Sequence, residues 1–202
     1  MPSRQLFTQF TSDMTCQSGA ISERIGVAGM KLLNWVRFTW DLNGLPSTPV
    51  DLPNHYQIAP ATNDDEKAVR KVLSCSFMLD PAWNPAIGEV MHSLQSWLDC
   101  AFVADESTCL TLRHGSRIIG ASVLCLNPAA EDNFAPGPCI LMEYRNRGFG
   151  TRLLHASLQR LRDSGLTRAS GIARELSPVA KFLYPKYNGI ALPVSSTVPL
   201  AA

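Results

Sequence analysis

Arginine and glycine residues gather in one segment of the chain, which reads EYRNRGFGTRLLHASLQRLRDSGL from Glu143 to Leu166. The residues in question are Arg145, Arg147, Gly148, Gly150 and Arg152. Arginine forms charge-assisted hydrogen bonds with phosphate, and glycine lets a phosphate approach the backbone because it has no Cβ atom. The leucine-spaced run that follows predicts a helix, whose first N–H groups attract an anion. The segment therefore predicts a phosphate-binding site at the start of a helix.

Two familiar phosphate-binding motifs do not fit this segment. A P-loop needs a lysine followed by serine or threonine, and no such pair occurs in the chain. A Rossmann fingerprint needs a third glycine, but Gly150 is followed by Thr-Arg-Leu. What remains is the pattern R-x-x-G-x-G, formed by Arg145, Gly148 and Gly150.

The composition limits the kinds of partner that we expect. The chain has 202 residues, of which 46% are hydrophobic, which suits one full domain with an extension. Its 18 Lys and Arg residues nearly balance 17 Asp and Glu residues, so we expect no nucleic-acid partner. No apolar run approaches the roughly 20 residues of a membrane span, and the N-terminus does not resemble a signal peptide. We therefore expect no membrane partner.

The six cysteines are scattered, without a C-x-x-C pair or a zinc-binding spacing, and they predict reduced thiols in a cytoplasmic protein. Cys139 lacks an identifiable base partner and is interpreted as a buried thiol, not a nucleophile. The four histidines have no mutual spacing that indicates a metal site, so we expect packed or solvated roles for them.

The N-terminal part of the chain predicts an extension over residues 1–54. Residues 1–20 are polar and expected to be loosely held, and residues 21–33 suit a short helix weakened by two glycines. Alternating residues from Trp35 to Trp40 predict a half-buried strand. Three prolines in GLPSTPVDLPN then predict a linker, so the main domain is expected over residues 55–190, with a tail at 191–202.

Within the main domain, the periodicity predicts strands alternating with helices. We expect a strand at 56–62, helices at 63–77 and 87–100, a hairpin at 107–127, a short central strand at 137–142, the helix after Gly148, a strand at 166–173 and a short helix between Ser177 and Pro185. This order predicts a mixed α/β (α+β) fold in which helices flank a central twisted sheet.

The motif and its setting resemble a known family. R-x-x-G-x-G at a strand-to-helix junction resembles [QR]-x-x-G-x-[GA], the signature of the GNAT superfamily of acyl-CoA-dependent N-acetyltransferases. The order of elements over about residues 55–190 is similar to that fold. The segment SPVAKFLYPKYNG resembles the family's later segment, in which a tyrosine commonly lies near the sulfur of the coenzyme. The resemblance implies a GNAT-like sheet and acetyl-CoA as the acyl donor.

The resemblance also assigns expected roles to particular residues. It places the pyrophosphate of coenzyme A around Arg145, Asn146, Arg147, Gly148, Phe149, Gly150 and Thr151. It places the pantetheine arm and acetyl carbonyl beside backbone groups of Ile140 and Leu141. Ser177 stands where the family often has an asparagine that contacts the coenzyme, and Tyr184 stands where a tyrosine protonates the departing thiolate.

The implied reaction is direct transfer of an acetyl group from acetyl-CoA to a primary amine of a small molecule or a protein. The amine must be neutral to attack, and a phenol with an ordinary pKa of about 10 can protonate the thiolate. The base stays open, because residues 136–142 contain neither an acid nor a histidine. Asp105, Glu106, Glu131 and Asp132 are candidates, beside a water relay or an amine that arrives deprotonated.

Two other functions fit the same sequence. One is a catalytically inert sensor that binds acyl-CoA, and the other is a scaffold that uses the fold without a coenzyme. The loops at 79–89 and 127–137, where an acceptor groove is expected from the resemblance, combine aromatic and acidic residues and favour a cationic amine.

The C-terminal end departs from the family. The family usually finishes with two further strands, but only thirteen residues follow Gly189, and they include two prolines. Because an unpaired sheet edge is a liability, we expect the strand from Trp35 to Trp40 to cover an exposed edge, in its own chain or in a homodimer.

Overall fold

The computed structural model describes residues 35–48, 51–80, 84, 87–103, 106–134 and 136–193. The strands are β1 (Trp35–Asp41), β2 (Tyr56–Pro60), β3 (Ser107–His114), β4 (Arg117–Cys125), β5 (Cys139–Ile140), β6 (Arg168–Arg174) and β7 (Ile190–Pro193), and the helices are α2 (Glu66–Met78), α3 (Ile87–Ala101) and α4 (Phe149–Asp163). The helix expected at residues 21–33 lies outside the described residues. The short helix expected after Ser177 is a single π-helical turn, Val179–Leu183.

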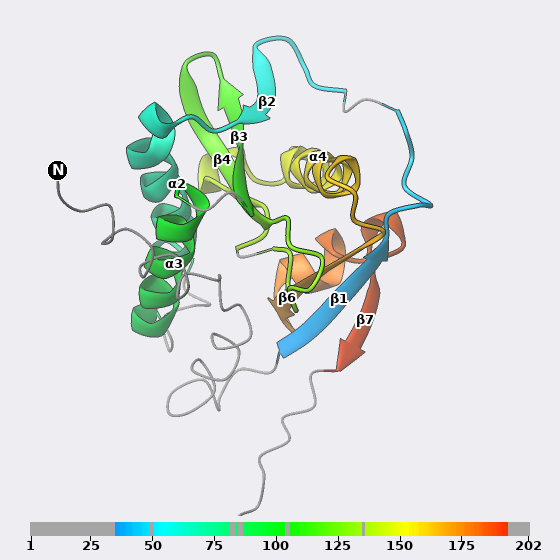
Figure 1. The fold of residues 1–202 in the computed structure, drawn as a ribbon. Helices are drawn as coiled ribbons and strands as arrows, with labels where there is room; N and C mark the ends of the chain where they lie inside the picture. Colours follow the sequence, from blue (N-terminus) through cyan, green and yellow to red (C-terminus); the bar gives the residue numbers. More distant parts are fainter. Residues whose placement is uncertain are drawn as a thin grey trace, which may run out of the picture.

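The strands form two sheets where one continuous sheet was expected. The first has the order β2-β3-β4-β5, and the second has the order β6-β1-β7. Helices α2 and α3 lie on one side of the first sheet and α4 lies on the other (Figure 1). The mixed α/β fold is thus confirmed, and the sheet is divided between β5 and β6.

Strand β1 is the middle strand of the second sheet. It pairs antiparallel with β6 and β7, so that Phe38 stands opposite both Gly171 and Ala191. Strand β1 covers the edge of β6 within its own chain and is itself covered by β7, so it is not the edge strand that the sequence suggested. The expected boundaries at residues 54 and 190 do not separate structural units here, because β1 lies before the first and β7 crosses the second.

The loop before β5 joins the two sheets at one end. Phe134 forms single bridges to Leu124 of β4 and Gly171 of β6. The Asn133 side chain donates to the Cys125 carbonyl at 3.1 Å and accepts from the Ser170 N–H at 2.9 Å. Farther along, β5 and β6 are not paired, so the sheets separate beyond Phe134.

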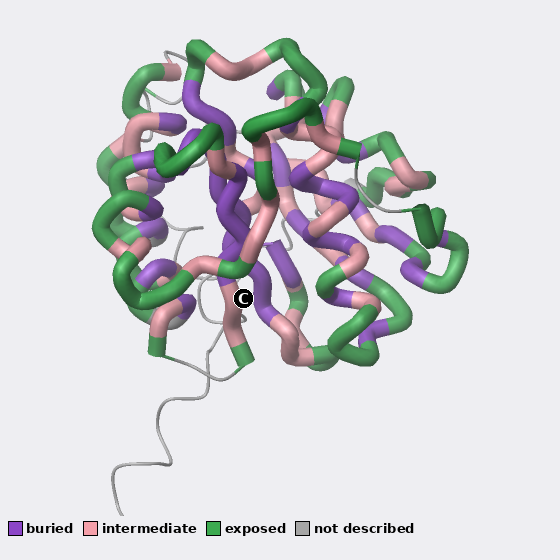
Figure 2. The backbone as a smooth tube through the Cα atoms, turned by 90° about the horizontal axis from the view of Figure 1, so that it is seen from above, coloured by how far each residue is buried: buried purple, intermediate pink, exposed green. Residues whose placement is uncertain are grey.

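The helices bury the faces that the sequence pattern predicts. In α4 the buried leucines are Leu153, Leu154, Leu158 and Leu161. In α2, Val69, Val72 and Leu73 are buried. The buried positions follow the central strands and the inward sides of the helices, and exposed positions lie on the outside (Figure 2). This burial fixes the start of α4 beside the end of β5.

The short strand β5 approaches β4 closely at a glycine. A Cβ atom on Gly120 would lie 2.5 Å from Ile140 Cδ1 and 2.9 Å from the Cys139 carbonyl oxygen. Both distances are too short for real atoms, so any larger residue would push β5 away. Gly120 thereby sets the position of the strand that leads into the phosphate-binding loop.

We predict that Gly120→Ala lowers the free energy of unfolding by about 1–3 kcal/mol, because overpacking at this site moves β5. Gly88→Ala is the matched control, since Gly88 lies in α3 and a Cβ there meets nothing within 4 Å. The control is expected to keep or slightly raise stability. Urea denaturation measures both variants, and equal midpoints would contradict the prediction.

Candidate functional site

The start of α4 exposes backbone donors in the loop that the sequence singled out. Gly148 caps the helix in the left-handed conformation, with φ 77°. Within the described ranges, no side chain caps the first N–H groups of this helix, and the first turn has no acidic residue. The Arg152 N–H donates to the Gly148 carbonyl at 3.2 Å. The N–H groups before it in the first turn are therefore free to bind an anion.

The two glycines of the motif have different physical roles. Gly148 needs to be glycine because of its positive φ, and a Cβ there would lie 2.6 Å from an Arg152 nitrogen. At Gly150, a Cβ would meet only the Leu183 methyl groups, at 3.7 and 3.8 Å, which is ordinary contact. The fold itself does not require glycine at position 150, so the space there is available to a ligand.

The arginines of the motif also divide by role. Arg145 donates to the Ile140 carbonyl at 3.0 Å, the Ser76 carbonyl at 2.9 Å and Asp80 at 3.3 Å. Its guanidinium thus ties β5 to the end of α2 and is directed away from the loop, which differs from the expectation that it supplies charge to a phosphate. Arg145 is a structural link in this arrangement.

Positive charge at the loop comes instead from Arg147 and Arg152. Arg147 is exposed and lies 5.6 Å from the centre of the Tyr144 ring. Arg152 donates to the Asp51 carbonyl at 2.6 Å and stands against Gly148. Asn146, between the arginines of the motif, is exposed and has a left-handed backbone, with φ 62°.

The remaining loop residues contribute through their backbones. Phe149 is buried and packs its ring 4.5 Å from that of Tyr56, so only its main chain faces the loop. Thr151 accepts a hydrogen bond from the Tyr187 hydroxyl at its carbonyl, at 3.4 Å. The sequence-predicted residues 145–151 are therefore together, but few of their side chains point outward.

The backbone of β5 offers one of its two expected donors. The Leu141 N–H is already bonded to the Ile119 carbonyl of β4, at 2.9 Å. Because backbone groups alternate along a strand, the Ile140 N–H points to the edge opposite β4, the edge at which the Ile140 carbonyl accepts a hydrogen bond from Arg145. Ile140 fits the expected backbone role, whereas the Leu141 N–H is occupied.

Tyr184 follows the π-helical turn and is buried at 2% exposure. Its ring packs edge-on against Phe38 at 5.4 Å and Trp40 at 5.1 Å between ring centres. Its hydroxyl occupies the space where Gly137, just before β5, would carry a Cβ atom. The phenol thus reaches from the segment between β6 and β7 to the loop just before β5.

Burial raises the pKa of Tyr184 above its ordinary value of 10.0, and the neighbouring Cys139 and Asp132 raise this pKa further. Cys139 is itself a poor nucleophile, because burial raises the pKa of its thiol to about 12. Both groups hold their protons at neutral pH.

The other expected contact, Ser177, is engaged locally. Its hydroxyl accepts a hydrogen bond from the Ala180 N–H at 3.2 Å, and the side chain is buried. Ser177 therefore caps the turn that leads to Tyr184, and its role toward a coenzyme stays a prediction.

The carboxylates considered as bases are mostly paired. Arg37 of β1 binds Asp132 through two nitrogens, at 3.1 and 3.2 Å, and Glu131 at 3.3 Å. Burial raises the pKa of Asp132, although Arg37 opposes this shift. Glu106 accepts from Asn127 at 2.9 Å, and Asp105 lies outside the described residues. None of these carboxylates lies on β5.

Sequence reasoning missed the residues that β1 brings to Tyr184. Phe38 and Trp40 surround its ring, and Arg37 binds the neighbouring loop. The alternation of this segment was visible in the sequence, but it indicated sheet packing only. Gly137, which makes room for the Tyr184 hydroxyl, had no local signal.

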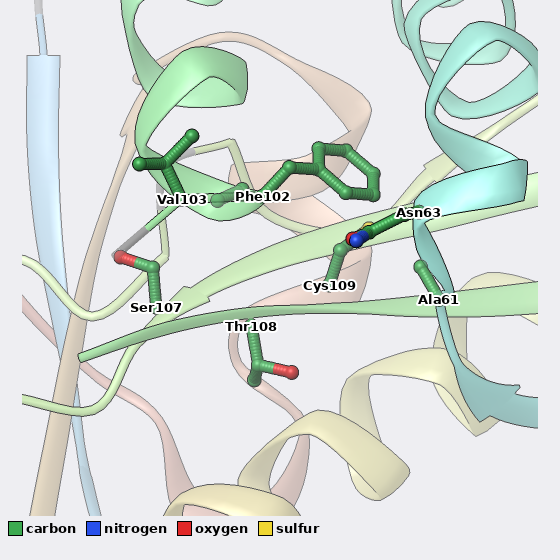
Figure 3. A pocket seen from close by; sticks show the side chains of 8 residues that line it. Ala61, Asn63, Phe102, Val103, Ser107, Thr108 and Cys109 are labelled. Carbon is green, nitrogen blue, oxygen red and sulfur yellow. The ribbon is translucent and has the colours of Figure 1, made fainter. Parts of the chain in front are cut away.

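A separate pocket of about 290 Å³ lies between the end of α3 and the start of β3. Its lining residues are Ala61, Asn63, Ala101, Phe102, Val103, Ser107, Thr108 and Cys109. In Figure 3 the Phe102 ring extends toward Asn63. Tyr144 contacts His114 at the other end of β3, so this pocket and the phosphate-binding loop lie at opposite ends of that strand.

The described part of the chain contains no group of three or more His, Cys, Asp or Glu side chains that could hold a metal ion. It also contains no helix with the length and apolar character needed to cross a membrane.

A model of the acetyltransferase (GNAT) family matches residues 68–189, which is more than half of the chain. The chain therefore belongs to the GNAT acetyltransferase family, whose acyl donor is acetyl-CoA. Among curated proteins, none matches this sequence.

Solved structures with the same fold have low sequence identity to the chain. A conserved protein of unknown function from Staphylococcus epidermidis has a TM-score of 0.53 and 11% identity, over 80% of this chain and 59% of that one. A GNAT-family protein from Novosphingobium aromaticivorans has a TM-score of 0.52 and 16% identity, over 80% of this chain and 60% of that one. A GCN5-related N-acetyltransferase from Sphaerobacter thermophilus has a TM-score of 0.51 and 13% identity, over 87% of this chain and 53% of that one. The chain spans less than two thirds of each of these proteins, and the likeness shows the fold.

We predict that the same substitution at two arginines of the motif affects two different properties, protein stability and coenzyme binding. Arg145→Gln removes bonds to two carbonyls and Asp80, and should lower the free energy of unfolding by about 1–3 kcal/mol. Arg147→Gln should change stability by less than about 0.5 kcal/mol but weaken coenzyme A binding about tenfold. Urea denaturation and titration calorimetry with coenzyme A measure the two effects. A stability loss at Arg147 alone would contradict the assignment.

Proposed function

We propose that the protein is an N-acetyltransferase that transfers the acetyl group of acetyl-CoA to a primary amine of a small molecule or a protein. The observation that carries this proposal is the R-x-x-G-x-G loop, which opens α4 with free backbone donors beside the gap between two sheets. Membership of the GNAT family supports the reaction class.

The loop residues fit the diphosphate of coenzyme A. First-turn N–H groups donate to phosphate oxygens, and Arg147 and Arg152 add positive charge. The Ile140 N–H points to the edge of β5 opposite β4, where it can bind a carbonyl oxygen. When bound, acetyl-CoA supplies an activated thioester, and the chain's own groups hold and orient it.

Tyr184 is proposed as the general acid. Its raised pKa keeps the phenol protonated at neutral pH, so it holds a proton at its hydroxyl oxygen for a departing thiolate. The hydroxyl lies beside Gly137, next to the strand that carries Ile140. The proposed donor of the proton and the proposed carbonyl-binding N–H are thus on the two sides of the same gap.

The acceptor is proposed to be a cationic amine that loses its proton before attack. Glu131 and Asp132 share the single guanidinium of Arg37, so this cluster keeps a net negative charge, and the Glu131 side chain is 52% exposed. Since β5 carries no acid, a water relay or prior deprotonation of the amine supplies the neutral nucleophile.

A catalytically inert acyl-CoA-binding protein is the second candidate. Two observations favour it: β5 lacks an acid or a histidine, and the Ser177 hydroxyl is engaged by Ala180. A scaffold without any coenzyme would be a third case. Calorimetry with acetyl-CoA separates the scaffold from the other two, and thiol release across a panel of amines separates the enzyme from the sensor.

Location and assembly belong to the same proposal. A cytoplasmic location is supported by the free thiols at Cys75, Cys109, Cys125 and Cys139. Homodimer formation is proposed at the outer edge of β7, where Ile190 and Leu192 are exposed.

We predict that Gly150→Glu abolishes coenzyme A binding, with a dissociation constant raised by at least about 100-fold, because a carboxylate would repel the diphosphate. An acidic residue in the first turn favours a helix, so the melting temperature should not fall. Gly150→Ala is the control and should bind within about threefold of the wild type. Calorimetry measures the affinity for coenzyme A, and thermal unfolding measures the melting temperature. Wild-type affinity in the glutamate variant would exclude this loop as the binding site of the diphosphate.

We predict that Tyr184→Phe lowers kcat by about 10²–10⁴-fold, the range typical of a general acid, while coenzyme A affinity is unchanged. Tyr187→Phe is the matched control, because it loses only a 3.4 Å bond to the Thr151 carbonyl. Thiol release with a reactive amine measures both, and full activity of the Tyr184 variant would rule out its role.

The raised pKa of Tyr184 also predicts the pH dependence. Deprotonation of the phenol would lower the rate only above pH 10.0, the ordinary pKa of tyrosine. Deprotonation of the acceptor amine, in contrast, raises the rate, because only the neutral amine attacks. We therefore expect kcat/KM to increase with pH and to show no falling limb up to about pH 9.5. A bell-shaped profile with a descending pKa near 8 would contradict an acid with this environment.

A further inference from the structure

The N-terminal strand β1 forms the wall around Tyr184. Trp40 and Phe38 both meet its ring edge-on, with interplanar angles of 84° and 75°. All three side chains are buried. The family match begins at residue 68, so these two aromatic residues stand outside the region shared with the family.

Trp40 also fixes the chain that follows Tyr184. Its indole N–H donates to the Lys186 carbonyl at 3.1 Å. Gly189 completes the contact, because a Cβ there would lie 1.9 Å from the Tyr184 carbonyl oxygen and 2.6 Å from the indole nitrogen. One side chain of β1 therefore contacts both the phenol ring and the turn that holds its backbone.

The segment that bears Tyr184 has little regular structure of its own to orient the ring. The Tyr184 N–H bonds to the Val179 carbonyl, five residues back, which is a π-helical turn. Tyr187 and Asn188 then adopt left-handed backbones, with φ 57° and 62°. Such conformations persist only where surrounding contacts impose them. Strand β1 supplies one of those contacts through Trp40 and Lys186, and α4 contacts Tyr187 through His155 and Thr151.

We propose that Trp40 is a positioning residue for Tyr184, so that the N-terminal strand completes the catalytic centre. This inference rests on the proposed acetyltransferase function and on the role of Tyr184 as its acid. Trp40 packs against the ring of Tyr184, and the hydroxyl lies in the space left by the missing Cβ of Gly137. Together these contacts keep the ring in a single orientation toward β5.

A double-mutant cycle tests the coupling. Trp40→Phe keeps an aromatic ring but loses the indole N–H, and should lower kcat about tenfold with KM for acetyl-CoA unchanged, since small misplacements of reacting groups are costly. In a Tyr184→Phe background the same change should alter kcat by less than about twofold. Equal losses in both backgrounds would show a merely structural role and overturn the proposal.

Two further variants make the cycle decisive. Trp35→Phe is the matched control on the opposite face of β1 and should keep kcat within about twofold. Phe38→Leu removes the other edge contact with Tyr184 and serves if Trp40→Phe does not fold. A tenfold loss at Trp35 and none at Phe38 would overturn the assignment.

Fluorine NMR gives a readout that does not need turnover. The chain has four tyrosines, and the 3-fluorotyrosine signal lost in Tyr184→Phe identifies the one of interest. The wild type should give one narrow line, and Trp40→Phe should give two lines or one broadened by exchange between ring orientations. An equally narrow line would overturn the proposal. If no amine is acetylated, the proposed function fails, and the line shape still decides whether Trp40 fixes the ring.

Discussion

The pairing of β1 with both β6 and β7 is the interaction on which the rest of the site depends. It builds the second sheet from segments at the two ends of the chain. Because Phe134 joins the sheets at only one end, they separate between β5 and β6, and no strand pairs with β5 on the side opposite β4. That edge of β5, the start of α4 and the phenol of Tyr184 then meet at one gap.

Much of the fold could be predicted from local patterns, and the exceptions have a common physical cause. Apolar periodicity identified α2, α3, α4 and the β3–β4 hairpin, since each element buries one face. The alternation in β1 identified a strand but not its partners, because pairing depends on residues far away in the chain. The short β5 could not be delimited, as only Cys139 and Ile140 pair with β4.

The candidate site was predictable in position but not in the direction of its side chains. The order of arginines and glycines located the loop, because helix starts and missing Cβ atoms are properties of the sequence itself. It could not show that Arg145 reaches back to Ser76 and Asp80, since those partners lie in and just after α2, far away in the sequence. In the same way, burial of Tyr184 depends on β1, which no motif connects to it.

The position of β1 also determines when the site can form during synthesis. Phe38 emerges from the ribosome long before its two partners, Gly171 and Ala191, which lie far behind it in the sequence. Such long-range pairing is slow and leaves apolar strands waiting for their neighbours. The first sheet needs only residues up to Ile140, so it can assemble first. The wall around Tyr184 closes later, once β6 and β7 have been made.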